Sequence, residues 1–437
     1  MKKSKGISNQ MDMLNGSIFD KILLFALPLA ISSILQQLFN SVDVAVVGRF
    51  ASSEALAAVG SNSSVISLLI NLFVGISVGA NVVIANYIGQ GKTEKIQDAV
   101  HTVMIISLIS GVFLLVLGLM IARPILEIMG TPENVIDLAV LYLHIYFLGM
   151  PAMAVYNFGT AVFSAVVNTK KPLLFLTTAG VANVVMNLFF VIVCGLGVAG
   201  VAIASAASQC ICAVLIVVSL LRSKENIALR PHALKVSPDK ARFVLRLGIP
   251  AGFQNAIFAI ANLFIQSGVN SFDAVTVEGN SAAANSDALV YDVMNAFYMA
   301  CSSFISQNMG AKKKKRMLQS YFISLAYSFG AGAVLGLSLV VFGRQFLSLF
   351  TKDAAVMEAG MARLRVLGFS YMVSAFMDNT IAASRGLGKA LLGLEDFRLY
   401  FICADEDFAK TFGRKEDKRR KLYNGNIRCY FYQYFRQ

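Results

Sequence analysis

The chain has 437 residues, of which 57% are hydrophobic and 14% charged, and its mean hydropathy is +0.66. A soluble domain has about 25% charged residues, so this composition excludes an ordinary water-soluble protein and indicates an all-α polytopic membrane protein. The net charge of +13 does not indicate a nucleic-acid partner, because Lys and Arg lie in short clusters between apolar segments, as in loops that orient membrane helices.

After a polar, basic N-terminus the chain is a series of apolar segments. A helix needs about 20 apolar residues to cross a bilayer, and ten segments are long enough. In chain order the predicted spans are Ile18 to Val47, Val65 to Tyr87, Val103 to Ile121, Ala139 to Val167, Leu173 to Val193, Val198 to Leu221, Phe243 to Phe272, Ala282 to Ser306, Tyr321 to Phe342 and Met361 to Ala383. The first span is longer than a signal-peptide core, so we expect no cleavage.

Basic residues concentrate in every second connection between these spans. Clusters follow spans two, four, six and eight, whereas the odd-numbered connections carry few basic residues. The clusters are Lys92 and Lys95; Lys170 and Lys171; Arg222, Lys224, Arg230, Lys235, Lys240 and Arg242; and Lys312 to Arg316. The positive-inside rule therefore predicts a bacterial inner (plasma) membrane protein whose N-terminus and even connections are cytoplasmic.

The second half of the chain repeats the first. Pairs of identical residues recur in order at a nearly constant offset. They are Pro28 with Pro250, Asn40 with Asn262, Ile84 with Ile305, Gly89 with Gly310, Arg123 with Arg344, Leu126 with Leu347, Gly149 with Gly368 and Lys170 with Lys389. The repeating unit has six helices, an even number, so both copies enter the membrane from the same side. This predicts two parallel repeats with a substrate site between them.

The repeat divides the chain into five parts. We predict a cytoplasmic N-terminus over residues 1–17, a six-helix lobe over 18–221, a cytoplasmic linker over 222–242, a second lobe over 243–393 and a divergent charged tail over 394–437. The second lobe is predicted to have four helices rather than six, because residues 395–437 contain 17 charged residues in 43 and no apolar run that could span. The tail is either a regulatory cytoplasmic segment or a replacement for two helices, for instance through a frameshift.

Asp43 is the most informative polar residue in the predicted spans. It lies near the end of the first span, where an ionisable side chain is costly to keep and indicates an ion or substrate site. The residues that we expect to line a cavity with it in the first lobe are Gln36, Gln37, Asn40, Asn183 and Asn187. A carboxylate hydrogen-bonded within the bundle as part of the scaffold is the alternative that the sequence leaves open.

The second lobe carries acids and amides of its own. The candidates for a second cavity are Gln254, Asn255, Asn262, Asp287, Asp292, Asn295 and Asp378. A purely structural role is as compatible with these residues as a cavity. In both lobes the predicted spans offer acids and amides rather than several Arg or Lys, which favours a cationic or neutral cargo over an anionic one.

Several short motifs recur along the chain between residues 28 and 390. They are the pattern Pro28, Gln36, Gln37, Asn40, Asp43, Gly48; EALAAVG at Glu54 to Gly60; GQGK at Gly89 to Lys92; GLGVAGVAIAS at Gly195 to Ser205; SQNMGAKK at Ser306 to Lys313; and SRGLGKA at Ser384 to Ala390. In combination they resemble the motifs of the multidrug and toxic compound extrusion (MATE) family, in its bacterial DinF-like branch. The resemblance covers residues 15–393. It implies a twelve-helix, two-lobe transporter opening as a V, which exports organic, often cationic, compounds in exchange for protons or sodium ions.

The same resemblance implies a role for Asp43. In the family, the acid of the first span lies in the cavity of the first lobe and couples ion binding to substrate release. A proton and a cationic substrate can compete for one carboxylate. Many family members have an acid where Asn187 stands in this chain, so the chain departs from the pattern and the coupling ion stays open between H+ and Na+.

We therefore expect a monomeric, ion-coupled antiporter that exports amphipathic organic cations across the inner membrane, without a cofactor or a metal site. A flippase of lipid-linked saccharides is an alternative, because MATE proteins share a superfamily with such exporters; a truncated chain without activity is another. The three histidines lie on separate elements and form no catalytic cluster, so we expect no enzyme. The sequence lacks a phosphate-binding loop of the Walker type, which disfavours an ATP-driven pump.

Overall fold

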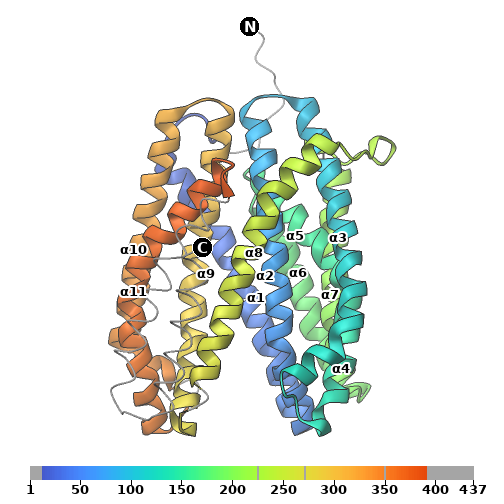
Figure 1. The fold of residues 1–437 in the computed structure, drawn as a ribbon, viewed down its shortest axis with the longest axis vertical. Helices are drawn as coiled ribbons and strands as arrows, with labels where there is room; N and C mark the ends of the chain where they lie inside the picture. The colour runs from blue at the N-terminus through green and yellow to red at the C-terminus, as the bar shows by residue number, and fades with distance from the viewer. Residues whose placement is uncertain (1–11, 224–225, 270–271, 349–350, 391–437) are drawn as a thin grey trace, which may run out of the picture. The chain divides into compact units, whose positions relative to one another are not determined.

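The computed structural model describes residues 12–223, 226–269, 272–348 and 351–390, all within one compact unit, Met1–Glu395, and over these residues it is helical with no strand. The first half contains α1 (Ile18–Phe50), α2 (Ser53–Gly89), α3 (Thr93–Ile128), α4 (Glu133–Leu148), α5 (Met150–Ala165), α6 (Lys170–Leu188), the π-helical turn η1 (Phe189–Val193) and α7 (Gly197–Leu221) (Figure 1). The second half contains the 3-10 turn η2 (Pro231–Ala233), α8 (Pro238–Val269), α9 (Ala274–Gly310), α10 (Lys314–Leu347) and α11 (Ala354–Gly386).

Each predicted span coincides over most of its length with helix in the described residues, but the fourth is broken. Eight single helices, and the pair α4 and α5 counted as one span, are long and apolar enough to cross a membrane among the described residues. The two members of the pair meet at an angle of 49°. Pro151 stands in the first turn of α5, where it cannot donate the backbone hydrogen bond that would continue α4.

The predicted tenth span lies in α11, which is long enough to cross a membrane but is not among the helices that are apolar enough. Its charged residues are Glu358, Arg363, Arg365, Asp378 and Arg385. The structure shows partners for Glu358, Arg363, Arg365 and Arg385 on neighbouring elements or on α11 itself. The predicted tail, residues 394–437, lies outside the described residues.

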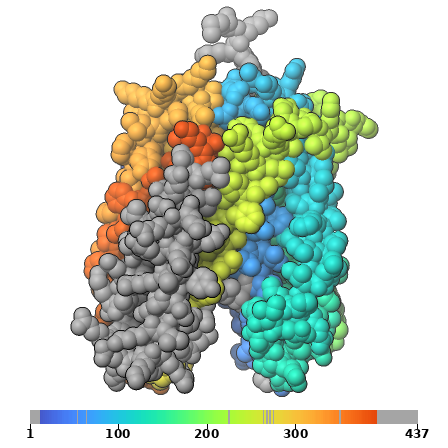
Figure 2. Space-filling view, viewed as in Figure 1, coloured from blue at the N-terminus to red at the C-terminus, as the bar shows by residue number. Residues whose placement is uncertain are grey.

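Exposed apolar side chains cover the helices, as expected where a surface faces lipid. On α8, for example, Phe253 and Phe264 are 59% and 67% exposed. Part of α8 is visible at the surface between helices of the two halves in Figure 2. A soluble protein would bury such side chains, so these helices are built for a bilayer.

The sequence repeat recurs as structure. At the same end of each half, Arg123 Nη1 lies 3.0 Å from Asp137 Oδ1, and its repeat mate Arg344 Nη2 lies 2.7 Å from Glu358 Oε2. Leu126 and its mate Leu347 are both fully buried. The predicted pairing of the two halves is therefore confirmed in the fold, with four helices of the second copy inside the described residues.

The two halves meet where α2 approaches α9. Gly89 and its repeat mate Gly310 face the backbone of the opposite helix: a Cβ atom on Gly89 would lie 1.9 Å from the carbonyl oxygen of Gln307, and one on Gly310 would lie 2.1 Å from that of Asn86. A backbone carbonyl cannot move aside as a flexible side chain can, so only glycine permits this approach. The two contacts are equivalent, which marks a pseudo-twofold axis between the halves.

Two further seams flank this axis. In the seam between α2 and α8 the helices approach at glycines, and in the seam between α1 and α9 the repeat-equivalent positions are buried alanines. The glycines are Gly75 and Gly79 of α2 and Gly248 and Gly252 of α8; the alanines are Ala26 and Ala30 of α1 and Ala296 and Ala300 of α9. Small side chains let membrane helices pack closely, so both seams hold the halves together.

The basic connections lie at one end of the helices. Figure 1 shows the α2–α3 and α9–α10 connections at the same end as the chain between α7 and α8. At this end the linker is held to α3, because the N–H of Arg230 donates to His101 Nε2 at 3.1 Å and the N–H of Ser237 donates to Thr102 Oγ1 at 3.0 Å. We call this the basic end. The common side that the sequence predicted is confirmed for the basic connections after the second, sixth and eighth spans.

Candidate functional site

Asp43 lies where α1 meets α6 and α7. Asn187 of α6 donates a hydrogen bond from Nδ2 to Asp43 Oδ1, and Ser205 of α7 donates from Oγ to Asp43 Oδ2 at 3.1 Å. Asn187 also donates to Asn183 Oδ1 at 3.1 Å. The carboxylate is thus hydrogen-bonded within the bundle, as the scaffold alternative required, but its partners are a neutral amide and a neutral hydroxyl.

The local sequence explains how α6 reaches this carboxylate. Asn183 and Asn187 are one helical turn apart and share a buried face. Gly180, one turn earlier, lets α1 come close, since a Cβ atom there would lie 1.9 Å from Cε2 of Phe39. Of the two amides that we expected beside Asp43, Asn187 contacts it directly, whereas Asn183 reaches Asp43 only through Asn187.

Ser205 is a site residue that the sequence analysis did not single out. After η1 the chain reverses direction through Gly195 and Gly197, whose φ angles of 64° and 50° are in the left-handed region that favours glycine. This turn starts α7 and brings Ser205 back beside α1. The only sequence signal was that the GLGVAGVAIAS motif ends on this serine.

Two tyrosines of α4 border the same carboxylate. The rings of Tyr142 and Tyr146 are stacked, with centroids 6.0 Å apart and planes inclined by 14°. Both side chains are buried, and both lie within electrostatic range of Asp43.

The other predicted residues of the first lobe do not contact Asp43. Gln36 and Asn40 are exposed and Gln37 is half-buried along α1. Within the described residues, no hydrogen bond joins their side chains to the Asp43 carboxylate. They lie on the accessible part of α1 rather than in the hydrogen-bonded cluster.

Asp287 of α9 is bound very differently. Arg363 of α11 donates from Nη2 to Asp287 Oδ2 at 3.0 Å and from Nη1 to Asn280 Oδ1 at 2.6 Å. Tyr371, two turns further along α11, donates its hydroxyl to Asp287 Oδ1. Both partners of the ion pair are largely buried, with side chains 23% and 27% exposed. The negative charge of Asp287 is therefore already compensated within the lobe.

Asp378 of α11 has a second arginine nearby. Arg385 lies two turns along the same helix and within electrostatic range of Asp378. Its Nη2 donates to Gln254 Oε1 at 2.7 Å and to Asn255 Oδ1 at 3.1 Å, which links α11 to α8. Gln254 is fully buried. These contacts bring three of the predicted residues of the second lobe together around one guanidinium group.

The remaining candidates of the second lobe stand apart. Asn262 is exposed near the end of α8, and Asn295 and Asp292 of α9 are half-buried. No hydrogen bond or ion pair connects them to the Asp287 or Asp378 groups within the part of the chain that the structure describes. The expected second cavity is therefore two arginine-centred clusters and a separate carboxylate.

The expectation that the spans offer acids and amides without arginines is wrong for the second lobe. Arg363 and Arg385 both belong to the α11 region, and each donates to a carboxylate or an amide. Arg363 lies inside the predicted tenth span and Arg385 stands just after it, where basic side chains usually reach toward water. Composition therefore gave no sign that they turn toward other helices.

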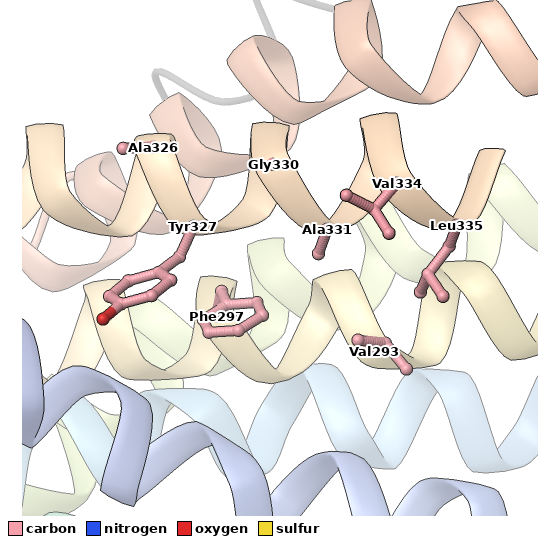
Figure 3. A pocket seen from close by; sticks show the side chains of 8 residues that line it. All are labelled: Val293, Phe297, Ala326, Tyr327, Gly330, Ala331, Val334 and Leu335. Carbon is pink, nitrogen blue, oxygen red and sulfur yellow. The ribbon is translucent and has the colours of Figure 1, made fainter. Parts of the chain in front are cut away.

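An apolar pocket of about 400 Å³ lies between α9 and α10 (Figure 3). Its lining residues are Val293, Phe297, Ala326, Tyr327, Gly330, Ala331, Val334 and Leu335. Tyr327 has the only polar side-chain atom in this lining, and its hydroxyl donates to the carbonyl oxygen of Phe19 at 3.5 Å. This lining offers no carboxylate for a cation.

Comparison with known proteins gives a family for this architecture. The MatE family model matches residues 28–189 and 250–395. The chain is 27% identical over 384 residues to "Probable multidrug resistance protein YoeA" of Bacillus subtilis (strain 168), covering 86% of this chain and 82% of that protein. It is 23% identical over 313 residues to a "FAD transporter" of Shewanella oneidensis, covering 70% of this chain and 69% of that protein.

Solved structures share the fold. One that is described as the "Outward-facing conformation of a multidrug resistance MATE family transporter of the MOP superfamily" superposes with a TM-score of 0.84 at 22% sequence identity. The match covers 89% of this chain and 87% of that structure. The predicted two-lobe arrangement of parallel repeats is therefore confirmed.

Proposed function

The chain belongs to the MATE (MatE) family of multidrug efflux transporters, and from this membership we propose that it is an ion-coupled antiporter that exports amphipathic organic cations across the bacterial inner membrane. The coupling ion is H+ or Na+, and Asp43 is the residue that binds it. The basic end faces the cytoplasm, in accordance with the positive-inside rule.

The observation that carries this proposal is the neutral environment of Asp43. Asn187 and Ser205 orient its two oxygens, but neither brings a positive charge. An ionised carboxylate in a partly desolvated site favours a cation that arrives from outside the chain. A proton, a sodium ion or the positive group of a cargo can each supply that charge, and this competition is what an exchanger needs.

The path of α1 indicates how occupancy of Asp43 can reach the other half. The outer part of α1 meets α6 and α7 through Asp43. The part near the basic end packs on α9, where the rings of Phe25 and Phe304 meet edge to face at 6.0 Å. Pro28 lies in the stretch of α1 that packs on α9, between the seam residues Ala26 and Ala30, and interrupts the hydrogen bonding of the helix before Asp43. A change at Asp43 can thus bend α1 and alter the contact between the halves.

Export of an anionic cargo, such as a lipid-linked saccharide, is the second candidate. Arg363 and Arg385 favour it, because arginine is the side chain that binds phosphate groups best. A relative named as an FAD transporter belongs to the same set of similar proteins. Against it, each guanidinium already donates to an acid or an amide of the lobe. An anionic cargo would have to displace those contacts.

The experiment is export of ethidium by the purified chain in liposomes under an imposed H+ gradient or an imposed Na+ gradient. We expect one gradient to drive export, and Asp43→Asn to reduce export to the level of liposomes without protein. The matched control is Asp137→Asn, because Asp137 is an exposed acid that pairs with Arg123 and not with a residue of the Asp43 cluster. Wild-type export by Asp43→Asn would contradict the role of Asp43. Failure of the wild type to export with both gradients would contradict the antiport itself.

A further inference from the structure

The three acids of the second lobe differ in how their charge is balanced. Asp287 forms an ion pair with Arg363, and Asp378 lies near Arg385. Asp292 has no hydrogen bond and no ion pair with any residue in the described ranges, 12–223, 226–269, 272–348 and 351–390. It is half-buried on α9, a helix that contributes to the contact between the halves. No positive group in the described residues pairs with its negative charge, so the carboxylate can pair with a cation that is not part of these residues.

The repeat shows where Asp292 lies in the architecture. Asp292 stands one turn before Ala296, which packs in the seam between α9 and α1. The equivalent residue of α2 is Asn71, one turn before Gly75, which packs in the seam between α2 and α8. Asp292 and Asn71 are therefore equivalent positions on the two helices that meet at the pseudo-twofold axis, each beside a seam to the other half.

Both side chains are at least partly exposed. Asn71 is exposed, and its backbone carbonyl accepts a hydrogen bond from Asn255 Nδ2 at 3.3 Å, so α8 passes beside it without covering the side chain. Asp292 retains partial exposure at the corresponding place on α9. A carboxylate and an amide thus stand on opposite helices at the boundary between the lobes, where transporters of this architecture bind their substrates.

The chemistry of this pair selects one kind of cation. Hard metal ions require several oxygen ligands, and among the described residues no three His, Cys, Asp or Glu side chains gather to hold a metal ion. A single carboxylate suits an organic ammonium group, which needs one counter-charge and brings its own apolar surface. Because the opposite residue, Asn71, is neutral, the pair balances one positive charge and not two.

We propose that Asp292 binds the positive charge of the exported cargo, an organic monocation, at the boundary between the two lobes. This inference rests on the proposed export of organic cations and adds a cargo-selecting carboxylate on the lobe opposite Asp43. Asp292 discriminates between charged and neutral cargo, whereas Asp43 binds the coupling ion.

Binding of three related ring compounds to the purified full chain in detergent tests this role. Ethidium is a monocation, propidium is a dication with the same rings, and phenanthridine is the uncharged ring system. We expect Asp292→Asn to weaken ethidium binding about tenfold. This effect lies between that of losing a fully exposed charge pair and that of losing a fully buried one. Phenanthridine, measured by competition, should bind Asp292→Asn as it binds the wild type. We expect Asn71→Asp, which adds a second carboxylate at an exposed position, to favour propidium over ethidium.

The outcomes separate this inference from the proposed function. Three results would each overturn the role of Asp292. The first is equal ethidium affinity in the wild type and Asp292→Asn, and the second is an equal loss of affinity for ethidium and phenanthridine in the variant. The third is no ethidium binding by the wild type. If Asp292→Asn does not fold, the Asn71→Asp variant provides the test. If this variant has the same preference between propidium and ethidium as the wild type, the role of Asp292 is overturned. A wild type that binds ethidium through Asp292 but does not export it in liposomes would contradict the antiport alone.

Discussion

Asp43 of the first lobe and Asp287 of the second lobe are held in opposite ways. In the first lobe, Asp43 accepts hydrogen bonds from Asn187 and from Ser205, at 3.1 Å for the serine, and both donors are neutral. In the second lobe, Asp287 is held by the guanidinium of Arg363 at 3.0 Å. Neutral donors orient a carboxylate without cancelling its charge, whereas an arginine does both. The charge of the partners, and not the presence of an acid in a span, therefore separates a candidate ion site from a structural ion pair.

The strongest test of the comparison between Asp43 and Asp287 is at Asp287, where we expect the largest change in stability. Asp287→Asn removes the counter-charge of a largely buried arginine, so we expect the free energy of unfolding to fall by about 2 kcal/mol, between the values for buried and exposed pairs. Export per folded molecule should be retained, because the ion pair has a structural role. Thermal unfolding in detergent, together with liposome export normalised to folded protein, measures both quantities.

A double variant serves as the control for that change. In Asp287→Asn with Arg363→Met, neither member of the pair remains charged, so stability should recover in part relative to the single change. Loss of export in Asp287→Asn at normal stability would show that the second lobe also has an ion site and that the contrast between the lobes is false.

An effect of intermediate size is expected at Ser205. The direction in which the affinity for the coupling ion changes tests the contrast between Asp43, which has neutral donors, and Asp287, which has an arginine. Ser205→Ala removes one hydrogen bond to a carboxylate, worth about 1 kcal/mol, or about a fivefold change in affinity for the coupling ion. If the ion is H+, the variant should need less of it for half-maximal export, because the ionised carboxylate loses a donor. If the ion is Na+, it should need more, because an oxygen ligand is lost.

Ser208→Ala is the matched control for Ser205→Ala. Ser208 lies on the same helix, and its hydroxyl donates to the backbone carbonyl of Ser205 at 2.8 Å rather than to Asp43. It should leave the ion dependence of export unchanged. The same shift in both serine variants would show that the packing of α7, and not the hydrogen bond to Asp43, controls the ion.

The smallest effect is expected at an arginine–acid cluster outside the spans. The hydrogen bond from Arg344, followed by the charge of Arg365, holds the pKa of Glu358 below its usual value of 4.5. Because the pKa is lowered in the folded state, the cluster contributes stability above about pH 4.5, and this contribution is lost as the pH falls through the lowered pKa. Glu358→Gln should therefore slightly lower the melting temperature at neutral pH and flatten its decline in acid.

Melting curves in detergent between about pH 3 and 7 measure this dependence. The comparison in the first lobe is Asp137→Asn, which removes the partner of Arg123 at the equivalent position. Both changes should be much smaller than the change at Asp287, because water screens exposed pairs. A loss at Glu358 as large as that at Asp287 would show that burial does not distinguish the two arginine pairs.

Much of the fold was predictable because each part of it depends on a local property. Apolar length identified the spans, and clustered Lys and Arg predicted which connections share one end. The repeat predicted that Gly89 and Gly310 are equivalent, and the structure shows them in equivalent contacts across the axis. The break between α4 and α5 was missed because the apolar run continues through Pro151, and length alone does not register a bend.

The candidate site was predicted only in part. Asp43 and Asn187 were found because an acid and a pair of amides one turn apart are unusual in a span. Ser205 was not, because serine is common in membrane helices and its role depends on what it touches. Arg363 and Arg385 were not among the predicted site residues, although both donate to partners on α8 or α9.

Transfer from water to lipid acts on each segment separately, so the order of residues was sufficient to define the helices, their common basic end and the repeated unit. The balance of each buried charge depends on helices that are distant in the chain. Ser205 is 162 residues from Asp43, and Arg363 is 76 residues from Asp287. No local pattern encodes such separations, so packing alone determined that one acid is met by neutral groups and the other by an arginine.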